Sequence, residues 1–207
     1  YPLDATLWSM KIEDALAGIA DDNLRACVAE ATSGKQQVSE VTELNCARRQ
    51  VSALNGLSGL TNLTTLVLHD NQVTDVSELS GLINLTFLNL GNNLTDISGL
   101  SGLTNLTWLR LGNNAITDIS GLSGLTNLTW LDLQGNGYIT DVSGLSGLTN
   151  LTDLFLGNSQ ITDISGLSGL TKLAHLFLNS NQITDISGLS GLTNLTELRL
   201  DNNQITD

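Results

Sequence analysis

The sequence has few aromatic residues, little proline and little positive charge. Only 4% of its 207 residues are aromatic, proline occurs once, and 8 Lys plus Arg stand against 21 Asp plus Glu, a formal net charge of -13. Nucleic-acid binding requires a basic stripe, so this charge argues against a nucleic-acid partner and weakens an anionic membrane surface as a target. No apolar run reaches 18 residues, so the sequence predicts no insertion into a membrane.

In place of these features the sequence repeats one motif. Each copy reads L-x-x-L-x-L-x-x-N-x-I, as in Leu106, Leu109, Leu111, Asn114 and Ile116. Successive copies are 22, 21, 22, 23, 22 and 22 residues apart, counted between the first leucines Leu63, Leu85, Leu106, Leu128, Leu151, Leu173 and Leu195. Such regularity is typical of a solenoid, in which every repeat is one structural unit.

This pattern resembles the leucine-rich repeat, specifically the 22-residue form of the internalin-like surface proteins of bacteria. The resemblance covers residues 41–207 and implies an α/β horseshoe with a parallel β-sheet on its concave face. The residues support it independently, because apolar positions alternate around Leu109 and Leu111 as in a half-buried strand. After Ile116 the apolar spacing becomes three, which predicts 3₁₀ turns or extended backbone on the convex face.

Residues 1–40 are expected to form a helical N-terminal cap, followed by the repeat domain of residues 41–207. Asp21 and Asp22 precede an apolar stripe typical of a helix, and Trp8 is expected to pack on this cap. We expect one degenerate first repeat and seven further repeats, the last one truncated. Because no polar closing cap follows the last repeat, the sequence is expected to be cut from a longer protein.

Cys27 lies on the apolar stripe of the cap, and Cys46 occupies an inward leucine position of the first repeat. Both thiols therefore point at the junction between cap and repeats, where a disulfide is plausible. The alternative is a pair of buried free cysteines that act as small hydrophobic residues.

Two polar columns are explained by structure rather than by ligand chemistry. The first column has an asparagine after each strand, and its inward amides are expected to hydrogen-bond backbone groups of the turns. Ser159 is an exception that is expected to reach fewer partners. The column is Asn71, Asn93, Asn114, Asn136, Asn181 and Asn203. The second column has one acid per repeat and is expected to cap the following turn rather than bind calcium, which needs six to eight oxygens; it is Asp75, Asp96, Asp118, Asp141, Asp163, Asp185 and Asp207.

Variation between repeats concentrates on the two outward positions of each strand, whereas the return segments hardly change. Side chains alternate along a strand, so both positions are expected to face the concavity. All three Phe and two of the three Trp fall there. The predicted ligand-binding residues on this face are Phe87, Trp108, Arg110, Trp130, Asp132, Asp153, Phe155, His175, Phe177, Glu197 and Arg199.

Exposed aromatic residues at neighbouring positions favour a contact surface, although cross-strand ring pairs also stabilise a sheet. We therefore expect a non-enzymatic module for protein binding or adhesion, extracellular or on the bacterial cell surface. Carbohydrate binding and a structural spacer are the alternatives. His69 and His175 lie five strands apart without a nucleophile nearby, so no catalytic site, cofactor or metal is expected.

Overall fold

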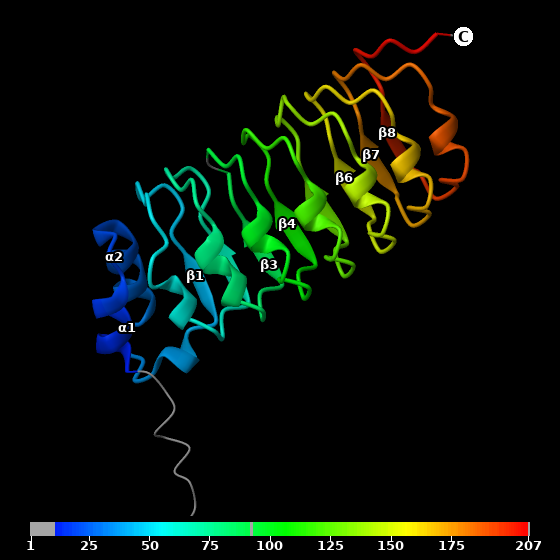
Figure 1. Ribbon diagram of the computed structural model, residues 1–207. Coiled ribbons are helices and arrows are strands. Elements are labelled where there is room, and N and C mark those ends of the chain that lie inside the picture. Colours follow the sequence, from blue (N-terminus) through cyan, green and yellow to red (C-terminus); the bar gives the residue numbers. More distant parts are fainter. Residues whose placement is uncertain (1–10, 92, 207) are drawn as a thin grey trace, which may run out of the picture.

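The computed structural model describes residues 11–91 and 93–206, which form a curved solenoid (Figure 1). Within these residues eight short strands make one parallel sheet, and each strand pairs with that of the next repeat. The strands are β1 (Glu43–Asn45), β2 (Thr65–Val67), β3 (Phe87–Asn89), β4 (Trp108–Arg110), β5 (Trp130–Asp132), β6 (Asp153–Phe155), β7 (His175–Phe177) and β8 (Glu197–Arg199). Equivalent residues of successive repeats lie opposite one another.

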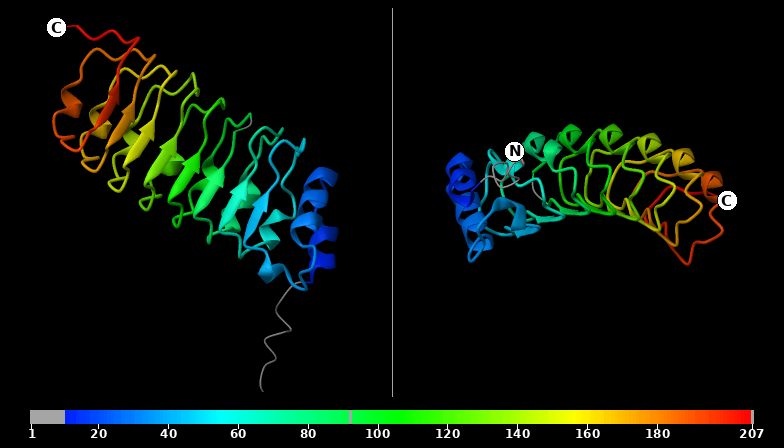
Figure 2. Two further views of the ribbon diagram at one scale, coloured as in Figure 1. Left: turned by 180° about the vertical axis from the view of Figure 1, so that it is seen from behind. Right: turned by 90° about the horizontal axis from the view of Figure 1, so that it is seen from below.

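Short 3₁₀ turns form the return path of the chain. Figure 2 shows these turns on the outer side of the curve and the strands on the inner side. The turns are η2 (Val38–Glu40), η3 (Leu57–Gly59), η4 (Ser77–Gly81), η5 (Ser98–Leu100), η6 (Ser120–Leu122), η7 (Ser143–Leu145), η8 (Ser165–Leu167) and η9 (Ser187–Leu189). The predicted horseshoe, with strands inside and 3₁₀ turns outside, is therefore confirmed.

The core is a stack of leucine layers between the sheet and the turns. In the repeat that contains β4, Leu106, Leu109, Leu111 and Ile116 are all completely buried. Burying one such side chain contributes about 1.5 to 3 kcal/mol, and each layer packs on the layers of both neighbouring repeats. Because this apolar packing fixes the strands, the outward side chains of the sheet are left available for contacts with other molecules.

The helical cap begins with α1 (Ile12–Gly18) and α2 (Asp22–Ala31). Asp21 caps α2 by accepting from the backbone N–H of Leu24 at 2.8 Å, and its second oxygen accepts from the N–H of Ser52 in the first repeat. A disulfide joins Cys27 to Cys46, so the prediction of a bond at this junction is confirmed. Trp8 lies outside the described residues.

Cap and repeats also approach closely at Gly56. This residue has a φ of 89°, and a Cβ there would collide with the carbonyl of Gly18 at the end of α1. Only glycine fits both the left-handed backbone and the contact. In the described residues no helix is long and apolar enough to cross a bilayer.

The asparagine column binds each turn to the preceding repeat. Asn136 is completely buried; its Oδ1 accepts from the N–H of Ile116 at 3.1 Å, and its Nδ2 donates to the carbonyls of Leu111 and Leu133 at 2.9 and 2.8 Å. The same role is played by Asn71, Asn114, Asn181 and Asn203. The predicted function of the column is confirmed at these positions.

Asn93 is an exception, and its predicted inward position is wrong because the side chain is exposed. Its repeat is one residue shorter after the strand, and Leu94 follows Asn93 directly. Since Leu94 is buried, the residue immediately before it is directed to solvent. Asn93 therefore does not belong to the column.

Ser159 reaches fewer partners than an asparagine, as expected. Its hydroxyl donates only to the carbonyl of Asn136, at 3.0 Å, among the described residues. The N–H of Ile139 also donates to that carbonyl, at 3.1 Å, within the loop that carries the extra residue near Tyr138. The longer loop therefore satisfies its own backbone where the column is interrupted.

The acidic column caps the 3₁₀ turns. In each case Oδ1 accepts from the backbone N–H of the serine two residues later, at 2.7 or 2.8 Å; the acids are Asp75, Asp96, Asp118, Asp141, Asp163 and Asp185. This confirms the predicted capping role at these positions, and Asp207 lies outside the described residues. The serine N–H lowers the carboxyl pKa below its ordinary value of 3.8 at Asp75, Asp96, Asp118, Asp163 and Asp185.

These carboxylates are expected to make the protein sensitive to acid. The pKa of these carboxyls is lower in the folded chain than in the unfolded chain. Their contribution to the free energy of unfolding is therefore complete above pH 3.8, and it is lost as the pH falls through their pKa in the folded chain. Thermal unfolding from pH 7 to pH 2 should show a melting temperature that falls mainly below about pH 4. Asp118→Asn keeps an acceptor that cannot titrate, so its melting temperature should fall less. A flat profile down to pH 2 would contradict this assignment.

Candidate functional site

Two columns of side chains cover the concave face of the sheet. The first column precedes the buried leucine of each strand and runs from Glu43 on β1 to Glu197 on β8. The second follows that leucine and runs from Asn45 to Arg199. All ligand-binding residues predicted from the sequence belong to these two columns, so the structure brings them onto one face.

Three rings of the first column form a stack. The ring centroids of Phe87 and Trp108 are 4.1 Å apart with an interplanar angle of 5°. Those of Trp108 and Trp130 are 4.2 Å apart at 7°. Neighbouring strands of a sheet are about 4.8 Å apart, so equivalent residues on β3, β4 and β5 place flat side chains at almost the stacking distance.

The row of rings continues into the second column. Trp130 and Phe155 are 5.2 Å apart with a tilt of 47°, and Phe155 meets Phe177 edge to face at 4.9 Å. The Arg199 guanidinium then lies 4.4 Å from the centre of the Phe177 ring. We call Phe87, Trp108, Trp130, Phe155 and Phe177 the aromatic band. The sequence placed all its members on one face.

Ion pairs border the aromatic band in the second column. The Nε of Arg110 lies 3.2 Å from Oδ2 of Asp132, and Oδ1 of Asp132 accepts from the N–H of Gln134 at 2.9 Å. Only 9% of Asp132 is exposed. Burial raises the pKa of Asp132 above its ordinary value, and the bonds from Gln134 and Arg110 oppose this shift. Arg110 and Asp132 lie opposite each other on β4 and β5.

A second polar cluster lies in the first column, beyond Trp130. The Nδ1 of His175 is 2.6 Å from Oδ1 of Asp153, whose Oδ2 accepts from the Thr152 hydroxyl at 2.6 Å. On β8, Glu197 pairs with Arg199 at 2.9 Å. In the described residues no group of three or more His, Cys, Asp or Glu side chains could hold a metal ion. The chemistry of the face is that of apolar rings bordered by paired charges, which suits recognition.

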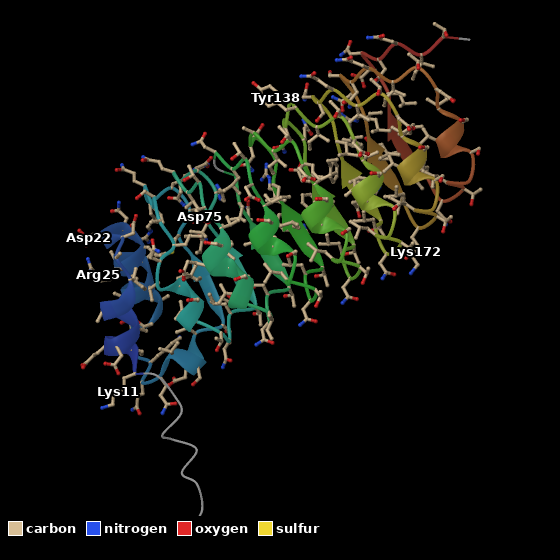
Figure 3. The ribbon with its side chains drawn as sticks, in the orientation of Figure 1. Lys11, Asp22, Arg25, Asp75, Tyr138 and Lys172 are labelled. Atoms are coloured by element: carbon tan, nitrogen blue, oxygen red, sulfur yellow. A yellow bond between two sulfur atoms is a disulfide. The ribbon has the colours of Figure 1, made fainter. Side chains whose placement is uncertain are left out.

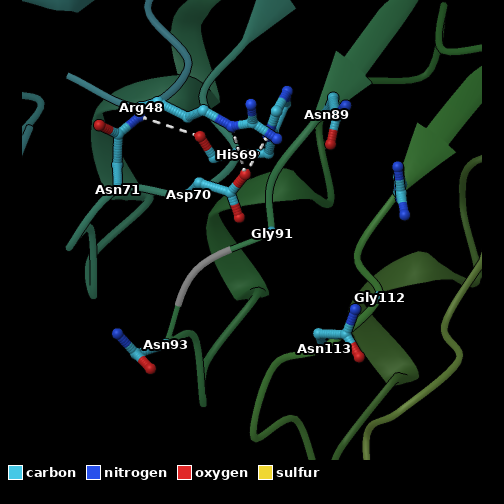
Figure 4. A pocket seen from close by; sticks show the side chains of 10 residues that line it. Arg48, His69, Asp70, Asn71, Asn89, Gly91, Asn93, Gly112 and Asn113 are labelled. Carbon is cyan, nitrogen blue, oxygen red and sulfur yellow. Dashed lines mark hydrogen bonds and ion pairs between the residues drawn. The ribbon is translucent and has the colours of Figure 1, made fainter. Parts of the chain in front are cut away.

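A polar hollow that the sequence did not predict lies where β1 to β4 end (Figure 4). It has a volume of about 400 Å³ and is lined by Arg48, His69, Asp70, Asn71, Asn89, Gly91, Asn93, Arg110, Gly112 and Asn113. Figure 4 shows Arg48 and His69 both directed at Asp70, at 3.1 and 2.9 Å. These two bonds hold the pKa of Asp70 below its ordinary value. The available signal in the sequence was the grouping of basic residues in the first repeats.

Comparison with known proteins gives a consistent family. A model of the family "Leucine Rich repeats (2 copies)" matches residues 39–81, 61–102, 83–124, 104–147, 126–169 and 171–207. No curated protein matches the sequence.

Among solved structures, an internalin (InlF) of Listeria monocytogenes is 37% identical with a TM-score of 0.90, and the match covers 98% of this chain and 62% of that one. Internalin C2 of the same organism is 32% identical with a TM-score of 0.72, and 90% and 96% of the two chains are covered. The functional domain of InlJ, described as including a cysteine ladder, is 27% identical with a TM-score of 0.62, covering 96% and 53%. The chain therefore spans less than two thirds of the InlF chain.

Proposed function

The chain belongs to the internalin-like leucine-rich-repeat family, and on this premise we propose that it is a non-enzymatic module that binds a protein partner. The contact surface is the aromatic band together with Arg110, Asp132, Asp153, His175, Glu197 and Arg199. The observation that carries the proposal is the continuous row of half-buried rings from Phe87 to Phe177 on the solvent side of the sheet.

The composition of this face fits a protein interface better than a purely structural ladder. Ring pairs stabilise a sheet by about 0.2 to 1 kcal/mol each, but leucine layers already hold these strands. Trp and Arg are the residue types that dominate the binding energy of interfaces, and here Arg110 and Arg199 border the rings. Adjacent apolar side chains on a soluble protein also mark contact surfaces.

The disulfide supports a location outside the reducing cytosol. Bonds of this kind form and persist in secreted and cell-surface proteins, and Cys27 and Cys46 hold the cap on the repeats. We therefore place the module outside the cytoplasm, at the cell surface or secreted, where adhesion to a partner protein is its role.

Trp130→Ala is expected to weaken binding of the partner by about 30-fold or more, because loss of a central interface tryptophan costs about 2 kcal/mol or more. The immobilised wild-type and variant proteins would be exposed to solubilised surface proteins, and captured proteins quantified by mass spectrometry. A protein lost from the variant is then purified and titrated against both. The melting temperature should fall only slightly, because Trp130 loses two ring contacts and no core packing.

Tyr138→Ala is the matched control, because Tyr138 is an aromatic residue that is 62% exposed on a loop outside the sheet face (Figure 3). It should bind the partner as the wild type does. Equal capture by the wild type and both variants would support the spacer alternative. Loss of capture with Tyr138→Ala alone would move the contact surface from the sheet to the loops.

A further inference from the structure

Asn89 has a buried side-chain amide whose oxygen is left without a hydrogen-bond partner among the described residues. It is 8% exposed, it lines the polar hollow, and its Oδ1 makes no bond in the described residues. Buried polar atoms in folded proteins are almost always paired. An unpaired one in the wall of a hollow indicates a group that the protein itself does not supply.

Equivalent residues show that the unpaired state is specific to Asn89. In the same column, Oδ1 of Asn45 accepts from the N–H of Ala47 at 3.1 Å, and Oδ1 of Asp132 accepts from the N–H of Gln134 at 2.9 Å. Both are local turns in which the side chain bonds the backbone two residues later. Asn89 does not form this turn with Gly91, so its oxygen remains available to a ligand.

The charges around the hollow are balanced. Arg48 pairs with Asp70, and Arg110 pairs with Asp132. Both ion pairs use Nε of the arginine, and in the described residues the terminal Nη atoms of these two arginines make no bond. The lining therefore offers donors and acceptors together, and Asp132, which lies outside the lining, pairs with its second arginine. This pairing disfavours a strongly ionic ligand in a protein with a net charge of -13.

We propose that the hollow binds a neutral saccharide, with one sugar hydroxyl donating to Asn89 Oδ1 and others contacting Asp70 and the arginine Nη groups. A hydroxyl both donates and accepts, so adjacent hydroxyls match a mixed lining. The volume of about 400 Å³ lies within the range of ligand pockets, about 300 to 1,000 Å³. This site contains no residue of the aromatic band, although it shares Arg110 with the proposed protein-binding surface, and it does not depend on the proposed protein partner.

The test is a nuclear magnetic resonance titration of isotope-labelled protein. Glucose, galactose, mannose, N-acetylglucosamine and N-acetylgalactosamine are each added up to about 50 mM, above the millimolar affinity expected of an open site. At least one sugar should shift the Asn89 side-chain amide and the backbone amides of Gly91 and Gly112. Asn89→Val should weaken this binding by about tenfold or more without lowering the melting temperature, since it removes an unpaired buried amide.

Asn45→Val is the control, because it makes the same change in the same column outside the hollow, and it should bind sugar as the wild type does. The proposal is overturned if no sugar shifts these amides, if Asn89→Val binds normally or is markedly less stable than the wild type, or if the shifts map to the aromatic band. Tighter binding of N-acetylneuraminic acid than of every neutral sugar would also overturn it.

Two crossed measurements separate this site from the protein-binding face. Trp130→Ala should retain the sugar shifts, and Asn89→Val should retain partner capture. Loss of capture and loss of sugar shifts in different variants would support two sites. Loss of both in the same variant would overturn the separate saccharide site.

Discussion

Asn136→Ala should lower the free energy of unfolding by about 3 kcal/mol, because it leaves two buried backbone groups unpaired at about 1 to 3 kcal/mol each and removes a third hydrogen bond. The unpaired groups are the N–H of Ile116 and the carbonyl of Leu133, whereas the carbonyl of Leu111 keeps its bond from Asn114. Ile116 and Leu111 belong to the preceding repeat, so the side chain couples neighbouring repeats as well as closing its own turn. Urea denaturation followed by circular dichroism measures the loss as a lower midpoint.

Ser159, which stands in the same column, and Asn93, which does not, provide controls of graded effect. Ser159→Ala removes one hydrogen bond and should cost about 1 kcal/mol. Asn93→Ala should change the stability by less than about 0.5 kcal/mol, because this side chain is exposed. Equal losses of stability for Asn93→Ala and Asn136→Ala would refute the exposed position that we assign to Asn93 in the shortened repeat.

The loss of the Asn136 bonds between two repeats should also be visible as faster hydrogen exchange in those repeats. Stability in such folds is the sum of repeat terms and nearest-neighbour terms, and Asn136 contributes to the interface between the repeats of β4 and β5. Hydrogen exchange in the variant should therefore accelerate first at amides of these two repeats. Uniform acceleration along the whole chain would indicate a single cooperative unit instead.

The repeat architecture could be predicted because its cause is local. The spacing of Leu106, Leu109 and Leu111 fixes which side of the strand is buried, and the spacing of three after Ile116 fixes the turn. The near-constant repeat length then superimposes every copy, which places the outward residues of all strands in two columns. Fold, strand positions and the face that carries the rings all follow from this single period.

What could not be predicted depends on how side chains of different repeats meet. The contact between Trp130 and Phe155 joins two columns, and alternation along a strand says only that both residues face outward. Asn89 also looks like any variable outward residue in the sequence. Its burial and its missing turn bond depend on the lining of the hollow by four successive repeats, which no single repeat encodes.

Reduction of the Cys27–Cys46 bond is expected to lower the stability of the cap by about 3 kcal/mol. The cysteines are 19 residues apart, and opening a loop of this length restores that much chain entropy to the unfolded state. Both side chains are buried at the contact between α2 and β1. Thermal unfolding of the wild type with and without reductant measures the effect, with the Cys27→Ala, Cys46→Ala double variant as the control that reductant should not change.

The loss of stability on reduction should be confined to the end of the molecule that carries the cap. Other contacts still join the cap to the first repeat, including Asp21 with Ser52, Asn23 with Gln50 and Glu30 with Arg49, but these side chains are largely exposed and contribute less than the covalent bond. Hydrogen exchange should therefore increase in α2 and β1 on reduction while β5 to β7 keep their protection, because each repeat contacts only its neighbours. Partner capture through Trp130 should then survive reduction. If capture were lost together with cap protection, the binding face would have to extend onto the cap.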